Sequence, residues 1–111
     1  MYRVFDCAGF TTDDLIVAGI SRAFIDGVDI LSISLGAAGG WDETPTAVVL
    51  SRVVSRGVIA VIAAGNSAFL SVLTASDPAA TSNVMAIASV ENIANMGWPA
   101  LTSRNQPIVW T

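Results

Sequence analysis

The chain has 111 residues, of which 53% are hydrophobic and only 13% charged, against roughly a quarter charged in typical domains. Nine acidic and five basic residues leave a formal net charge of −4, which argues against a nucleic-acid-binding protein. The longest apolar run, at positions 58–64, is far below the roughly 18 residues that a membrane-spanning helix needs. Since one small domain cannot bury this share of apolar surface, we expect a piece of a larger domain.

The first third of the chain predicts a strand, a helix and a second strand. Residues 2–7 predict the first strand, and its single cysteine, Cys7, is expected to be a small buried hydrophobe. Thr11 and Asp14 then form a helix-capping pattern. The apolar residues that follow them have the four-residue spacing of an amphipathic helix: Ile16, Ile20 and Phe24. Residues 28–35 predict the second strand.

The middle of the chain continues this alternation. Thr44 and Pro45 predict the start of a second helix, because threonine caps helices and proline suits their first turn. Residues 58–64 predict a third strand and residues 84–90 a fourth. An apolar run without alternation suits a strand covered on both faces. We therefore predict an α/β fold, a parallel sheet with helices on both faces in three αβα layers.

Two stretches break the alternation. Between Gly65 and Asn83 there is no convincing helical period, and long connections of this kind are often functional. The end of the chain has two tryptophans and two prolines but no period. We therefore assign residues 1–92 to one partial domain and residues 93–111 to a tail.

The ends of the second and third predicted strands carry the groups of chemical interest. Gly65 lets the backbone turn sharply, and Asn66 then offers a side-chain amide donor. Parallel neighbours place their carboxyl ends at one edge of the sheet, where such folds bind ligands. Taken alone, the Gly-Asn-Ser sequence is a weak signal, and a simple left-handed turn at Asn66 is the better explanation.

Other kinds of site find little support in the sequence. The glycine-rich run at 36–40 has neither of the known phosphate-loop spacings. There is no histidine, only one cysteine, and the acids are scattered, so we expect no metal and no cofactor.

The segments DILSISLG (29–36) and GVIAVIAAGNS (57–67), joined by the predicted helix, resemble the subtilisin-like serine proteases, or subtilases. The resemblance implies that Asn66 donates to the oxyanion formed during acyl transfer. It implies that the substrate cleft is lined by Ser34, Leu35, Gly36, Ala63, Ala64 and Gly65. It also suggests a cis peptide bond at Asp77–Pro78, because residues 78–88 line up with the family segment that follows such a bond, and an ordinary trans proline in a surface loop is the open alternative.

The family's motifs for the acid, the base and the nucleophile are absent, and a Ser-His-Asp mechanism needs an imidazole. We therefore interpret the chain as an internal part of a secreted subtilase that acts on peptides or proteins and needs the rest of its catalytic domain. We expect no signal peptide at Met1, because no apolar run follows before Asp6, so the signal of a secreted parent is expected upstream. The tail from residue 93 is expected to begin an inserted domain or an irregular extension. Two alternatives stay open. One is a non-catalytic protein-binding module or degenerate paralogue, and the other is a small ligand-binding protein unrelated to proteolysis.

Overall fold

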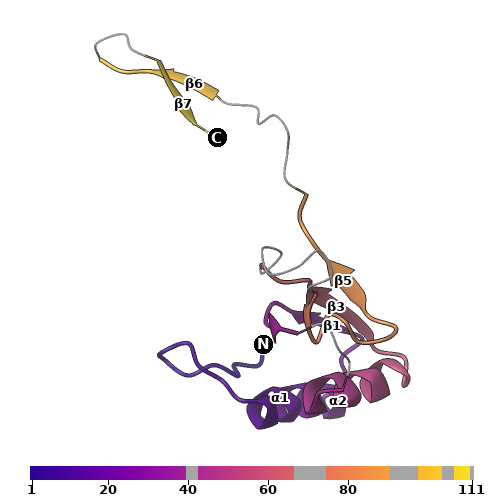
Figure 1. Cartoon of the computed structure of the whole chain (residues 1–111). Helices are drawn as coiled ribbons and strands as arrows, with labels where there is room; N and C mark the ends of the chain where they lie inside the picture. Colours follow the sequence, from indigo (N-terminus) through magenta and orange to yellow (C-terminus); the bar gives the residue numbers. More distant parts are fainter. Residues whose placement is uncertain (40–42, 67–74, 91–97, 104–106, 111) are drawn as a thin grey trace.

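A three-stranded parallel sheet with the strand order β1-β3-β5 forms the centre of the molecule (Figure 1). The computed structural model describes residues 1–39, 43–66, 75–90, 98–103 and 107–110. Helix α1 precedes β1, and α2 lies in the crossover that connects β1 to its parallel neighbour β3. The main elements are α1 (Asp13–Ile25), β1 (Ile30–Ile33), α2 (Pro45–Val54), β3 (Ile59–Ala63) and β5 (Met85–Ile87). The predicted α/β class and parallel sheet are confirmed.

Both helices pack against the same face of the sheet, as Figure 1 shows. Leu50 of α2 and Ile62 of β3 are completely buried at the centre of this layer. The alternate strand residues point to the opposite face, where their exposed fractions are 51–60%: Ile30, Ile59, Met85 and Ile87. The helical layer expected on that second face has no counterpart among the described residues.

The two helices begin in different ways. Thr44 caps α2 as predicted, because its Oγ1 accepts a hydrogen bond from the Ala47 amide at 3.2 Å, and Pro45 occupies the first turn. The capping pattern expected for α1 is wrong. Thr12 precedes that helix without a side-chain cap, and the Thr11 hydroxyl instead donates to the Val4 carbonyl at 2.6 Å.

The strand predicted at residues 2–7 is not formed. Asp6 turns the chain, because its Oδ1 accepts from the amides of Ala8 (2.9 Å) and Phe10 (2.8 Å). Local bonds of this kind compete with the pairing of a strand. Cys7 is exposed, so the expectation of a buried cysteine is wrong as well. The Arg3 guanidinium donates to its Sγ at 3.2 Å.

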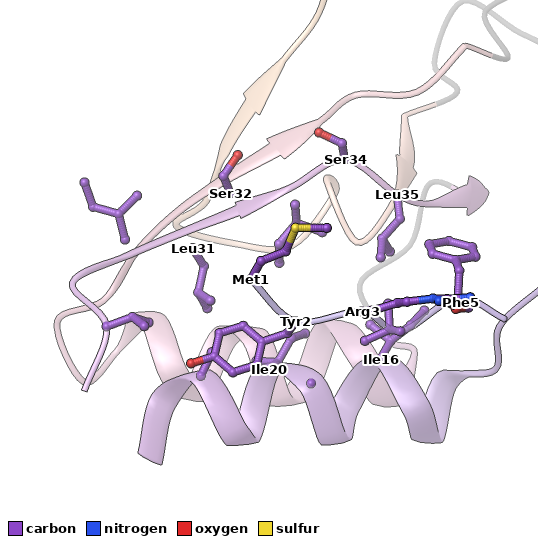
Figure 2. A pocket seen from close by; sticks show the side chains of 16 residues that line it. Met1, Tyr2, Arg3, Phe5, Ile16, Ile20, Leu31, Ser32, Ser34 and Leu35 are labelled. Carbon is purple, nitrogen blue, oxygen red and sulfur yellow. Dashed lines mark hydrogen bonds between the residues drawn. The ribbon is translucent and has the colours of Figure 1, made fainter. Parts of the chain in front are cut away.

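The N-terminal segment leaves a cavity of about 600 Å³ beside β1 (Figure 2). Tyr2 and Phe5 line it together with Ile16 and Ile20 of α1 and Leu31 of β1. Among the described residues, β1 is an edge strand of the sheet, and this cavity separates it from the N-terminal segment.

Short strands complete the described structure. β2 (Ala37–Ala38) pairs antiparallel with β4 (Ser76–Asp77), and the Asp77–Pro78 peptide bond is cis, as expected. In the tail, β6 (Trp98–Leu101) and β7 (Pro107–Trp110) form an antiparallel hairpin that the sequence did not predict. Residues 67–74 of the long connection lie outside the described residues. Neither helix of the described part has the length and hydropathy needed to cross a membrane.

Candidate functional site

The carboxyl ends of β1 and β3 lie side by side, because Ile33 pairs with Ile62 in parallel register. The structure thereby brings all seven residues singled out from the sequence to one edge of the sheet. Four of them are exposed and three are half-buried. The exposed ones are Ser34, Gly36, Gly65 and Asn66, and the half-buried ones are Leu35, Ala63 and Ala64.

Ser76 of β4 is the central residue that sequence reasoning missed. It is only 6% exposed and is bound to the end of β3 by two hydrogen bonds. Its amide donates to the Ala64 carbonyl and its Oγ donates to the Ala63 carbonyl, both at 2.8 Å. β4 therefore forms the floor against which the end of β3 rests.

Two glycines make room for Ser76. A Cβ atom added at Gly36 would lie 2.7 Å from the Asp77 carbonyl oxygen and 2.8 Å from Ser76 Oγ. A Cβ atom added at Gly65 would lie 2.8 Å from Ser76 Cβ. Gly65 also has φ +99°, a conformation that side chains rarely adopt. The only sequence signal for this packing is the glycine that directly follows each of the two predicted strands.

Asn66 follows Gly65 and is exposed at this edge. Among the described residues, its side chain has no hydrogen-bond partner. The exposed Ser34 follows the neighbouring strand β1 at the same edge of the sheet. The groups offered here are an amide, a hydroxyl and main-chain peptides.

The large cavity beside β1 is a different place. Ser34 and Leu35 lie at one end of it, whereas Gly65 and Asn66 are not among the residues that line it. The cavity is mostly apolar and follows from the gap left by the N-terminal segment. The candidate site therefore rests on the convergence of the strand ends and not on this cavity.

Comparison with known proteins identifies a family whose profile covers almost the whole chain. Residues 1–110 match the profile of the Subtilase family, Peptidase S8. The minor extracellular protease Vpr of Bacillus subtilis is 38% identical over 66 residues, which cover 60% of this chain and 8% of that protein. Subtilisin DY of Bacillus licheniformis is 33% identical over 94 residues, covering 84% of this chain and 34% of that protein.

A solved structure of low sequence identity has a similar fold. The solved structure of the prenylagaramide maturation protease PagA superposes with a TM-score of 0.61 at 19% identity, covering 95% of this chain and 34% of that one. The chain thus spans about a third, or less, of the length of the proteins it matches.

Proposed function

The chain belongs to the subtilase family, and we propose that it forms part of the catalytic domain of a subtilisin-like serine endopeptidase. In this proposal Asn66 is the oxyanion donor, and the ends of β1 and β3 are the walls of the substrate cleft. The observation that carries the proposal is the exposed Asn66 amide directly after Gly65, at the carboxyl edge of a parallel sheet.

The role of Asn66 follows from the chemistry of acyl transfer. The carbonyl oxygen of the scissile bond gains negative charge only in the tetrahedral intermediate. A fixed amide donor therefore stabilises the transition state more than the bound substrate. Loss of one such donor in subtilisin lowers kcat by about 10²–10³, a magnitude that belongs to that relative.

The substrate is an extended peptide. Residues 34–36 offer main-chain groups beyond the end of β1, and a substrate strand can pair with such an edge. Across from them, Ala63, Ala64 and Gly65 form a wall for the residue that precedes the scissile bond. Small residues on both sides leave room for a sizeable apolar side chain. Because Vpr is an extracellular protease, we extend the proposal to a secreted enzyme.

The remaining catalytic groups come from other parts of the complete enzyme, since this chain contains no histidine to act as a base. The same absence favours a second candidate, a degenerate paralogue or a non-catalytic module that binds peptides in the same cleft. The full coding sequence separates the two. A His-Gly motif upstream and a Gly-Thr-Ser motif downstream support the enzyme. The family match excludes a ligand-binding protein unrelated to proteases.

Kinetics of the complete enzyme test the role of Asn66. Asn66→Ala should lower kcat and leave KM nearly unchanged, because the oxyanion exists only in the transition state. Asn66→Asp should be at least as damaging, since it places a negative charge opposite the oxyanion. The control is Asn83→Gly. Asn83 is an exposed asparagine with φ +65° before β5, at the opposite edge of the sheet, where glycine fits the backbone. An Asn66→Ala variant that raises only KM contradicts the proposal.

A further inference from the structure

We propose that Asp77 is a positioning residue for the substrate cleft. Thr44, at the start of α2, holds Asp77, and Asp77 thereby keeps Ser76 in place between the carboxyl ends of β1 and β3. This inference rests on the proposed function, because it concerns the shape of the same cleft.

The two residues of β4 are held from opposite sides. Successive side chains of a strand point to opposite faces. Ser76 points to β3, where its Oγ donates to the Ala63 carbonyl at 2.8 Å. The Asp77 side chain reaches α2, where the Thr44 hydroxyl donates to its Oδ1 at 2.9 Å. The carboxylate therefore does not line the cleft and acts on it only through the position of β4.

Helix α2 strengthens this hold. The Thr44 hydroxyl also accepts from the Ala47 amide, so one oxygen atom both caps the helix and binds Asp77. The first turn of α2 contains no acidic residue. Asp77 therefore adds, from a distant part of the chain, a negative charge beside the first turn of α2, where the helix dipole favours it.

The atoms around β4 are closely packed. Ala37 of β2 pairs with Asp77, and a Cβ atom added at Gly39 would lie 3.1 Å from Asp77 Cβ. The Asp77 carbonyl oxygen is 2.7 Å from the place of a Cβ atom on Gly36. A small shift of β4 must therefore move Ser76 relative to both walls, which changes the width of the cleft and the side chains that it accepts.

The experiment alters the donor while keeping the helix cap, in the complete enzyme. Thr44→Ser retains both the cap and the donor. Thr44→Asp retains a good capping oxygen but cannot donate to Asp77 and repels it. Adding Asp77→Asn to Thr44→Asp restores the link, because the asparagine amide can donate to the new carboxylate. KM and kcat are measured with peptides that carry a small, a medium or a large apolar residue before the scissile bond.

Thr44→Ser should behave as the wild type. Thr44→Asp should raise KM by about threefold to tenfold, the effect of losing one hydrogen bond, with little change in kcat and an altered order of preference among the three peptides. The double variant should recover both the KM and the preference. Asp77→Ala, which leaves the α2 cap intact, should show the same change if Thr44→Asp does not fold.

Unchanged KM and preference in Thr44→Asp or in Asp77→Ala, or a double variant that recovers nothing, would overturn the inference. Failure of the proposed function gives a different result, namely an Asn66→Ala variant that affects only KM. The oxyanion and the position of β4 are thereby tested separately.

Discussion

Three glycine-to-alanine substitutions separate crowding from backbone strain, two of them in the candidate cleft and one outside it. Gly57 has φ +98° and nothing within 4 Å of an added Cβ, so alanine there meets backbone strain alone. Gly36 lies outside the left-handed region, so alanine there meets crowding alone. Gly65 combines φ +99° with a contact at 2.8 Å to Ser76 Cβ.

The expected losses of stability follow from these geometries. Gly57→Ala should lower the free energy of unfolding by about 1–2 kcal/mol, the cost of a left-handed L-residue. Gly36→Ala should lower it by about 1–3 kcal/mol, the usual cost of overpacking. Gly65→Ala should lower it by about 2–5 kcal/mol, because both effects act on one residue. Urea unfolding of the complete protein, followed by tryptophan fluorescence, measures all three.

Removal of the crowding atom provides the control. In a Ser76→Gly background, the penalty of Gly65→Ala should fall by about 1–3 kcal/mol, because its closest contact is gone. The penalty of Gly36→Ala should fall less, since the Asp77 carbonyl oxygen remains 2.7 Å away. If Gly65→Ala costs no more than Gly57→Ala, or if Ser76→Gly leaves its penalty unchanged, the close packing described for this edge is refuted.

The other predictions concern the N-terminal segment and the chain on its own. The Tyr2 hydroxyl donates to Asp26 at 2.8 Å and, with Arg22, holds the pKa of Asp26 below its usual value. Asp26 therefore stabilises the fold above its unfolded pKa of about 3.9, and this is lost as the pH falls through the folded pKa. Tyr2→Phe should raise the pKa in a carboxyl NMR titration, and an unchanged pKa would contradict this. The 111-residue chain alone should hydrolyse neither casein nor a peptide ester. Turnover that survives the removal of contaminating proteases and disappears in Asn66→Ala would contradict this prediction. It should also self-associate and lack a sharp thermal transition, because its open sheet face exposes Ile30, Ile59, Met85 and Ile87. A monomer in sedimentation with a cooperative transition would contradict this.

The regular elements could be predicted because their signals are long and local. The apolar run at 58–64 contains β3, and Thr44 with Pro45 marks the start of α2 within the sequence itself. Even here the strands are shorter than predicted, since pairing and not composition sets their ends. Asn66 and the flanking glycine could be placed at the sheet edge because parallel order alone dictates it.

The failures share a physical cause. The Thr11 side chain could cap α1 or bind the N-terminal segment, and it binds the Val4 carbonyl. Asp6 could lie in a strand or form a local turn, and its carboxylate accepts from the Ala8 amide in a turn. Ser76 and Asp77 form a strand of only two residues, which carries no periodicity. Their importance comes from an approach to Gly36 and Gly65 that exists only once the fold has formed.

The bonds that hold Ser76 have a consequence for how such a cleft can diversify. They end on the carbonyl oxygens of Ala63 and Ala64, and every amino acid supplies such an oxygen. Replacements at these two positions can therefore change the shape of the wall without breaking the two hydrogen bonds from Ser76. Positions 36 and 65 have no such freedom, because atoms of β4 occupy the space that a side chain would need. Under the proposed function, a new cleavage preference would therefore evolve through positions 63 and 64, while positions 36 and 65 stay constant.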